Sequence, residues 1–232
     1  FWSNYRERFS GAAGELDFLP DCIAIMDTVA KKDMMLAGFP EKILRITGQP
    51  AFDHLSNWAE QNRATLRKDL RSVRGDKKGD YVILFASQPL AEFYGEDPEA
   101  DGYLGFTQHT VLPSVLDALE QLAVRERCSI KLYIRPHPRE RPEGYKKYKG
   151  SQHLSVEVSQ LGEPKEAALA AELVIGMNTV LLVEAAIMGC RVLSIQPDLR
   201  GDDFLPFQRW GGATSVYDAE KIGPTLKDLF DE

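Results

Sequence analysis

The chain has 232 residues, of which 44% are hydrophobic and 27% charged, and its formal net charge is −7 at pH 7. This length allows one large or two small domains with a buried core, while the negative charge argues against general nucleic-acid binding, which relies on basic contacts to phosphates. The sequence has no run of 18 apolar residues, so no transmembrane helix is predicted. Three scattered cysteines, each beside apolar residues, predict buried, reduced thiols and a cytoplasmic location.

The first part of the chain alternates between short apolar runs and helical segments. Five elements are predicted, in the order strand, helix, strand, helix and linker: 22–26, 28–36, 42–47, 54–74 and 75–80. Thr28 can cap the first helix, and Gly38 with Pro40 beyond it can end that helix. We place the main boundary at the linker, which gives a partial N-terminal segment, 1–75, and a second domain, 76–232.

Beyond the linker the pattern restarts and becomes regular. The predicted strands are 81–87, 130–134, 154–158, 173–176, 191–196 and 215–217, with helices between them and at the end of the chain. Strands that alternate with helices predict right-handed crossovers and a parallel sheet. The strand cores are almost continuously apolar, as expected when helices cover both faces. The expected fold class is therefore α/β, with a Rossmann-like parallel sheet.

Three polar loops follow predicted strands directly: 87–89, 135–140 and 176–179. In open parallel sheets, ligands bind beyond the carboxyl ends of the strands, near the point where the strand order reverses. We therefore expect the three loops to converge on one crevice.

The last of these loops opens a helix with Asn178 and Thr179. A helix N-terminus offers free N–H groups to an anion, but one of these side chains can equally cap the helix, and the two roles are compatible. Glu184 lies in an otherwise apolar helix, where a buried carboxylate without partners is costly. It either reaches solvent or accepts hydrogen bonds from ligand hydroxyls, such as those of a ribose.

The loop at 135–140 has the sequence Arg-Pro-His-Pro-Arg-Glu. Two prolines stiffen the backbone around His137, which can serve as an anion donor, a general acid or a structural hydrogen-bond partner. Arg135 and Arg139 can offer paired contacts to a phosphate or carboxylate, although each can also be an ordinary surface arginine.

Several other kinds of site have no support in the sequence. It contains no G-x-G-x-x-G turn that opens a helix after the first strand, no phosphate-binding loop of the G-x-x-x-x-G-K-[ST] type and no G-x-S-x-G motif. Its His, Cys and Asp residues show no metal-ligand spacing. We therefore expect metal-independent chemistry with no cofactor beyond the substrate.

Three stretches resemble the GT-B-fold glycosyltransferases and sugar-nucleotide epimerases. Residues 22–55 are similar to the end of the N-terminal domain in that group, RPHPRE resembles its His-Pro motif, and VIGMNTVLLVEAAIMGCRVLSI resembles its C-terminal nucleotide-binding helix. The resemblance implies phosphate contacts from His137 and from Asn178 or Thr179, and a ribose contact from Glu184. One departure is the Met-Asn-Thr turn, because the family usually has a serine-rich turn there. Another is the length before the linker, which is too short for a complete first domain.

The resemblance implies the C-terminal, nucleotide-sugar-binding part of a GT-B glycosyltransferase, with the tail of its N-terminal domain attached. Its donor would be UDP- or CMP-linked, and its acceptor a surface polysaccharide or glycolipid, with a peripheral contact to the inner membrane face as a further expectation. A catalytic base would come from the missing part of the first domain. A UDP-N-acetylglucosamine 2-epimerase-like enzyme and a non-catalytic nucleotide-binding or scaffold module stay open as alternatives.

Overall fold

The computed structural model describes residues 6, 9–11, 14–205, 207 and 211–231. The chain divides into two compact units, Phe1–His54 and Leu55–Glu232. This division falls near the start of helix α3 (Pro50–Arg74), whereas the boundary expected from the sequence lies at the end of that helix. The assignment of residues 1–75 to the tail of an N-terminal domain stays a prediction. In the described part of the chain, no helix is both long and apolar enough to cross a membrane.

The first unit is built around one strand–helix–strand repeat. Strands β1 (Ile23–Ile25) and β2 (Leu44–Ile46) pair in parallel, with helix α2 (Thr28–Leu36) and the short turn η1 (Glu41–Ile43) between them. Their buried residues form a small core: Ile25, Met34, Phe39, Ile43 and Leu44. The helix has the predicted bounds, but the prediction of its cap was wrong by one residue. Asp27 is the extended N-cap residue, and its carboxylate accepts a hydrogen bond of 2.7 Å from the N–H of Ala30.

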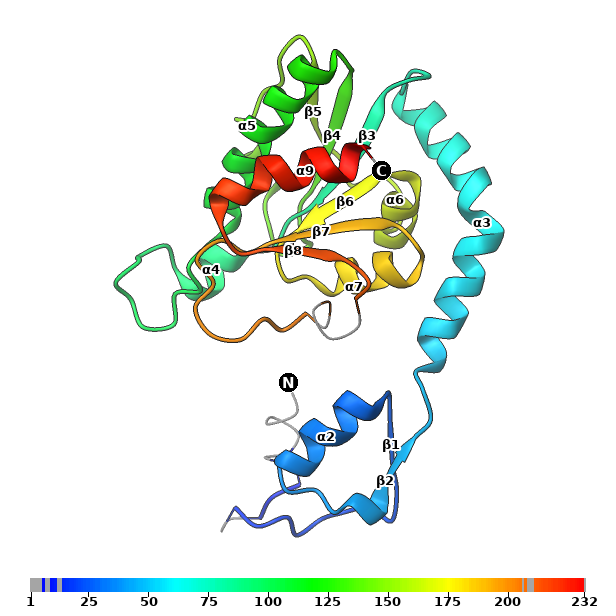
Figure 1. The fold of residues 1–232 in the computed structure, drawn as a ribbon, viewed down its shortest axis with the longest axis vertical. Helices are drawn as coiled ribbons and strands as arrows, with labels where there is room; N and C mark the ends of the chain where they lie inside the picture. The colour runs from blue at the N-terminus through cyan, green and yellow to red at the C-terminus, as the bar shows by residue number, and fades with distance from the viewer. Residues whose placement is uncertain (1–5, 7–8, 12–13, 206, 208–210, 232) are drawn as a thin grey trace. The chain divides into compact units, whose positions relative to one another are not determined.

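The second unit is a six-stranded parallel sheet with helices on both faces (Figure 1). Its strands are β3 (Tyr81–Ala86), β4 (Ile130–Arg135), β5 (Leu154–Val158), β6 (Leu173–Gly176), β7 (Arg191–Ile195) and β8 (Thr214–Val216), in the order β5-β4-β3-β6-β7-β8. Its other elements are α4 (Leu90–Tyr94), α5 (Gln108–Glu126), α6 (Pro164–Ala170), α7 (Val180–Ile187), α9 (Ile222–Asp231) and the short turns η2 (Pro142–Tyr145) and η3 (Ala219–Lys221). The predicted fold class is confirmed.

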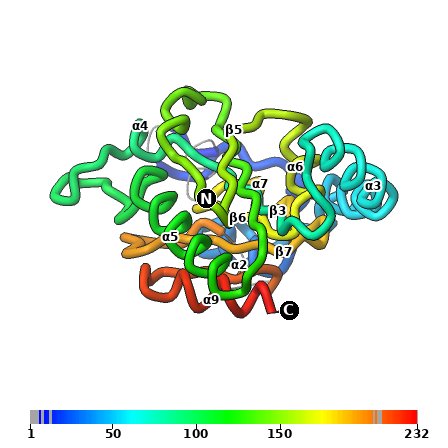
Figure 2. The backbone as a smooth tube through the Cα atoms, turned by 90° about the horizontal axis from the view of Figure 1, so that it is seen from above, coloured from blue at the N-terminus to red at the C-terminus, as the bar shows by residue number. Residues whose placement is uncertain are grey.

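Helices cover the sheet in two layers. Helix α5 packs against α9 on one face, and α6 packs against α7 on the other (Figure 2). Residues 82–86 of β3 are at most 3% exposed. Side chains on both faces of this strand are therefore buried, which explains why its sequence is a continuous apolar run instead of an alternating one.

Within the second unit, an arginine row on α3 contacts the ends of two other helices. We give this name to Arg63, Arg67 and Arg71, which are spaced four residues apart and so share one face of α3. The guanidinium of Arg63 donates to the carbonyl of Met188 at the end of α7, and that of Arg67 donates to the carbonyl of Ala171 at the end of α6, at 3.0 Å.

Arg71 completes the row. Its guanidinium donates to the carboxylate of Glu172 at 2.8 Å and to the carbonyl of Asp80 at 2.6 Å. The same carboxylate accepts the N–H of Val82 on β3, at 2.7 Å. Cations at helix C-termini interact favourably with the helix dipole, so Arg63 and Arg67 stabilise the contact of α3 with α7 and α6. Arg71 joins α3 to the residues that precede β3 and β6.

Two local features differ from what the sequence predicts. Helix α4 was not predicted as a separate element, because five residues are too few to show a helical pattern. The prediction of buried thiols is right for Cys190 and wrong for Cys22, which is exposed; Cys128 is intermediate, and all three are free.

Candidate functional site

The carboxyl ends of the central strands lie in one row. Ala86 of β3 pairs with Arg135 of β4 on one side and with Gly176 of β6 on the other. The chain runs outward from β3 to β5 and then returns to β6 on the opposite side of β3. This reversal is the topological switch point at which α/β proteins bind ligands. The three polar loops predicted to converge therefore do follow neighbouring strands at this point.

Two of these loops are joined directly. The N–H of Asn178, after β6, donates to the side-chain oxygen of Gln88, after β3, at 2.9 Å. Gly176, at the end of β6, is itself tightly surrounded, since a Cβ atom there would lie 3.1 Å from the carbonyl oxygen of Ala86 and 3.3 Å from Leu182 and Thr179. The side-chain amide of Asn178 has no hydrogen-bond partner among the described residues.

The start of α7 has the geometry for both roles predicted there, which are helix capping by Thr179 and binding of an anion. Its backbone is extended, and its hydroxyl accepts a hydrogen bond of 3.4 Å from the N–H of Leu181, so Thr179 is the N-cap. In the described part of the chain, the N–H groups of Thr179 and Val180 have no acceptor. Together with the positive end of the helix dipole, they form a place for an anion.

We expect Thr179→Ala to lower the free energy of unfolding by about 1 kcal/mol, because the cap hydroxyl is lost. Thr179→Ser keeps the hydroxyl and should be nearly neutral. Urea denaturation of both variants measures the difference, and equal stabilities would contradict the capping role.

The His-Pro loop is closed by its own hydrogen bonds. The N–H of His137 donates to the carboxylate of Glu140 at 2.6 Å, and the N–H of Glu140 donates back to the carbonyl of His137 at 2.8 Å. The imidazole Nδ1 of His137 accepts the N–H of Arg139 at 3.2 Å. In the neutral ring the proton is therefore on Nε2, which is left as a free hydrogen-bond donor.

A buried network holds this loop from below. The Glu140 carboxylate, in a residue only 8% exposed, also accepts hydrogen bonds from the hydroxyls of Ser87, at 3.1 Å, and Tyr145. Burial and the bond to Glu140 raise the pKa of Tyr145, so this hydroxyl stays protonated and keeps donating. No role was predicted for Ser87, Glu140 or Tyr145 from the sequence, although the three-residue spacing of Glu140 from His137 matches a self-bonded turn.

The two arginines of the loop lie in different surroundings. The guanidinium of Arg135 donates to the carbonyls of Leu161, at 3.2 Å, and Gly162, at 2.8 Å, and burial lowers its pKa. These bonds tie β4 to the loop that precedes α6, so the geometry favours a structural role. Arg139 is exposed, and its guanidinium lies 5.6 Å from the centre of the Phe93 ring on α4.

Glu184 is half-buried on α7, one turn after the exposed Val180. Its carboxylate has no hydrogen bond or ion pair with any described residue. It therefore reaches solvent at the edge of the helix and stays available to ligand hydroxyls. The ligand roles predicted for Arg135, Arg139, His137, Asn178, Thr179 and Glu184 stay predictions.

A second polar network lies beyond β7. Gln196, only 1% exposed, donates to Ser194 and Asp203, both at 2.9 Å, and the hydroxyl of Tyr217 donates to the same Asp203 carboxylate at 2.6 Å. Ser194 in turn donates to the carbonyl of Met177 at 2.7 Å, next to the start of α7. A hollow of about 560 Å³ adjoins this network, lined by Asp198, Leu199, Gly201, Asp202, Asp203 and Tyr217.

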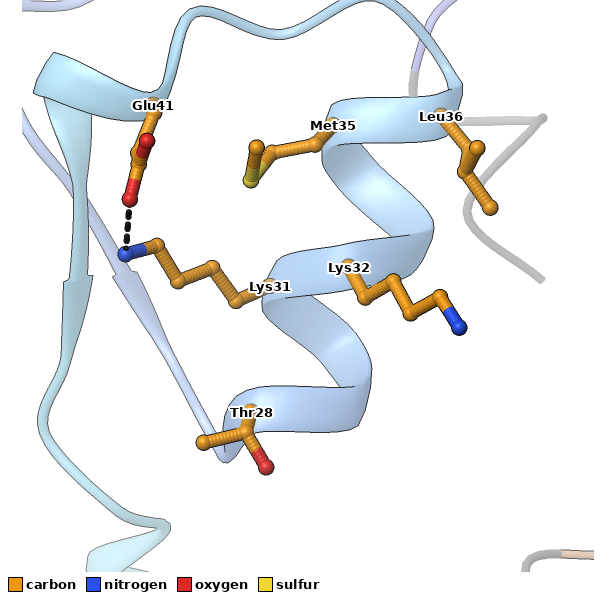
Figure 3. Close-up of a pocket in the computed structure, with 6 residues that line it drawn as sticks. All are labelled: Thr28, Lys31, Lys32, Met35, Leu36 and Glu41. Carbon is orange, nitrogen blue, oxygen red and sulfur yellow. Dashed lines mark hydrogen bonds and ion pairs between the residues drawn. The ribbon is translucent and has the colours of Figure 1, made fainter.

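Another hollow, of about 400 Å³, lies on α2 in the first unit (Figure 3). It is lined by Thr28, Lys31, Lys32, Met35, Leu36 and Glu41. Lys31 is bound to Glu41 at 2.7 Å, so its charge is already paired. This hollow offers no convergent set of free donors. Among the described residues, no three His, Cys, Asp or Glu side chains are grouped as metal ligands.

No protein-family model and no curated protein sequence matches the chain. Solved structures do match its fold. UDP-GlcNAc 2-epimerase from Methanocaldococcus jannaschii, in complex with UDP-GlcNAc and UDP, is 17% identical and has a TM-score of 0.58, over 94% of this chain and 56% of that one. The enzyme from Neisseria meningitidis, bound to UDP-GlcNAc, is 15% identical with a TM-score of 0.58, over 88% of this chain and 51% of that one.

The wall teichoic acid polymerase TagF, soaked with CDPG, is 14% identical with a TM-score of 0.51, over 91% of this chain and 47% of that one. The chain thus spans about half the length of these proteins. At such low identity the likeness shows the fold, which is the Rossmann-like α/β arrangement of GT-B proteins. The expected GT-B fold is confirmed.

Proposed function

We propose that the second unit is the nucleotide-sugar-binding part of a GT-B glycosyltransferase with a UDP- or CMP-linked donor and a surface polysaccharide or glycolipid acceptor. One observation carries the proposal: the His-Pro loop and the start of α7 follow neighbouring strands at the switch point, each with free hydrogen-bond donors. The structural neighbours that hold UDP or UDP-GlcNAc support this choice of ligand.

The proposed chemistry needs hydrogen-bond donors where negative charge develops on the phosphate of the leaving nucleotide. The Nε2–H of His137 and the N–H groups of Thr179 and Val180 would supply them, and Glu184 would accept hydrogen bonds from the ribose hydroxyls. The self-bonded loop fixes the His137 tautomer before the ligand arrives, so no reorganisation is needed on binding. A base that deprotonates the acceptor is proposed to come from outside the second unit.

Calorimetric titration with UDP and with CMP tests the nucleotide site. We expect saturable binding of one of them, weakened at least tenfold, or about 1.4 kcal/mol, by His137→Ala and by Glu184→Ala. His153→Ala is the matched control, since His153 precedes β5 at the opposite end of the sheet. Binding that His137→Ala and His153→Ala weaken equally, or no binding at millimolar nucleotide, would contradict the proposal.

A second candidate is a UDP-N-acetylglucosamine 2-epimerase-like enzyme. It is favoured by the TM-scores, which are 0.58 to the epimerases and 0.51 to the polymerase. Incubation with UDP-GlcNAc, followed by NMR, separates the two candidates. Formation of the sugar nucleotide inverted at C2, without any acceptor, would favour the epimerase.

A further inference from the structure

The peptide group that joins Met177 to Asn178, which we call the held peptide, is bound at both of its polar ends. Its carbonyl oxygen, on Met177, accepts a hydrogen bond of 2.7 Å from the hydroxyl of Ser194. Its N–H, on Asn178, donates to the side-chain oxygen of Gln88 at 2.9 Å. A peptide group is planar, so two bonds at its opposite ends fix the orientation of that plane. The next residue along the chain is Thr179, the N-cap of α7.

The two side chains that bind the held peptide come from opposite sides of it. Strand β6, which leads into the held peptide, lies between β3 and β7 in the sheet (Figure 1). Gln88 is the second residue after β3, and Ser194 lies within β7. The orientation of the held peptide is therefore set by side chains from both neighbouring strands and not by its own turn alone.

On the β7 side, the Ser194 hydroxyl is itself oriented. Ser194 and Gln196 are almost fully buried. The side-chain amide of Gln196 donates to the hydroxyl oxygen of Ser194 and to the carboxylate of Asp203, both at 2.9 Å. Because the Ser194 oxygen accepts this N–H, its own hydrogen is directed to the Met177 carbonyl. The carbonyl is thus held by a buried hydroxyl whose direction is fixed.

On the β3 side, Gln88 is adjacent to a residue that holds the His-Pro loop. The hydroxyl of Ser87 donates to the carboxylate of Glu140 at 3.1 Å, and the same carboxylate accepts the N–H of His137 at 2.6 Å. Consecutive residues after β3 therefore reach the loops on either side of this strand. Ser87 reaches the His-Pro loop and Gln88 reaches the start of α7, so together they set the position of one loop relative to the other.

We propose that Gln88 and Ser194 are positioning residues for the proposed nucleotide site. They hold the start of α7 in the orientation that presents the N–H groups of Thr179 and Val180, which follow the held peptide directly, to a phosphate. The inference rests on the proposed function and names the residues that prepare its anion-binding half. A turn that is already held loses little freedom when a ligand binds. Removal of either bond should therefore weaken phosphate binding, although neither side chain has to touch the phosphate.

Amide hydrogen exchange, followed by NMR on the isotope-labelled full chain without ligand, is the first test. We expect Ser194→Ala to speed exchange of the Asn178 N–H at least about tenfold, because loss of the carbonyl bond allows the held peptide to open. Gln88→Met removes the acceptor itself and should have the same effect, whereas Gln88→Glu keeps an acceptor oxygen and should stay close to the original rate.

Ser215→Ala is the matched control for Ser194→Ala. Ser215 pairs with Ser194 in register on β8, and its buried hydroxyl has no hydrogen-bond partner among the described residues. This control should leave the exchange of Asn178 unchanged. Circular dichroism should show that all variants are folded, and if Ser194→Ala is not, Gln88→Met at a half-buried position carries the test.

Titration with inorganic pyrophosphate, followed through the N–H signals of Thr179 and Val180, is the second test. We expect a saturable shift of both signals, with an affinity that Ser194→Ala and Gln88→Met lower at least about fivefold and that Ser215→Ala leaves unchanged. The absence of any shift, or equal affinities in all variants, would overturn the proposal, as would unchanged exchange of the Asn178 N–H in Ser194→Ala.

The two proposals can fail separately. If pyrophosphate binds at the start of α7 with the expected losses but neither UDP nor CMP binds, the nucleotide site is contradicted while the positioning role holds. If a nucleotide binds with equal affinity to the original chain, Ser194→Ala and Gln88→Met, the nucleotide site holds and the positioning role is overturned.

Discussion

Glu140→Leu is expected to lower the free energy of unfolding by about 3 kcal/mol and to weaken nucleotide binding at least tenfold. The carboxylate accepts hydrogen bonds from Ser87, Tyr145 and the N–H of His137, and leucine accepts none. A buried polar group left without a partner costs about 1–3 kcal/mol, and this change strips several at once. Urea denaturation gives the stability, and calorimetry with the nucleotide that binds gives the affinity.

Two companion variants make the result specific. Glu140→Gln keeps one acceptor oxygen and should recover part of the loss. Glu143→Leu changes the same residue type three positions away at an exposed site, where substitutions usually stay within about 0.5 kcal/mol. If Glu140→Leu were as mild as Glu143→Leu in both measurements, the buried network would have no part in holding the His-Pro loop.

Gly105→Ala is expected to cost at least about 3 kcal/mol of stability. Gly105 has a φ of +98°, a conformation that costs other residues about 1–2 kcal/mol. In addition, a Cβ atom there would lie 2.0 Å from the carbonyl oxygen of Asp198, far inside contact distance. Because that oxygen is backbone, the whole connection after β7 has to move.

Gly102→Ala separates the two contributions. Gly102 lies in the same loop with a φ of +92°, but a Cβ atom there meets nothing within 4 Å. This variant should lose only the conformational part, about 1–2 kcal/mol. If both variants unfold in urea with the same m value, the difference between their denaturation midpoints measures the cost of the contact between the Cβ atom introduced at position 105 and the Asp198 carbonyl oxygen. Equal destabilisation would show that the two loops separate without cost.

Much of the fold follows from local sequence. The continuous apolar runs of β3, β4, β6 and β7 predict a covered parallel sheet, because both faces of these strands are buried. The strand order could not be predicted this way, since pairing β6 with β3 joins residues about ninety positions apart. The short helix α4 and the cap at Asp27 were missed because a few residues carry too weak a pattern.

The sequence was sufficient to predict which loops form the candidate site. Polar residues directly after apolar strands indicate the carboxyl edge of a parallel sheet, and the register places Arg135 and Gly176 on either side of Ala86. What individual side chains bind was not predictable. Arg135 looks like a ligand for an anion in the sequence, yet its guanidinium is occupied by the carbonyls of Leu161 and Gly162, which follow the next strand.

The arginine row on α3 determines at which residue a fragment of the second unit has to begin in order to keep its contacts. A fragment that begins at Gly75 would remove the cations that cover the carbonyl ends of α6 and α7, and it would leave the Glu172 carboxylate with only the N–H of Val82. It would also uncover the surface that α3 buries through Ala59 and Leu70. A fragment that begins at Leu55 keeps all of these contacts. A fragment of the second unit that keeps these contacts therefore has to include α3 from Leu55 onward, even though the turn at residues 75–80, which follows α3, looks like a domain boundary in the sequence.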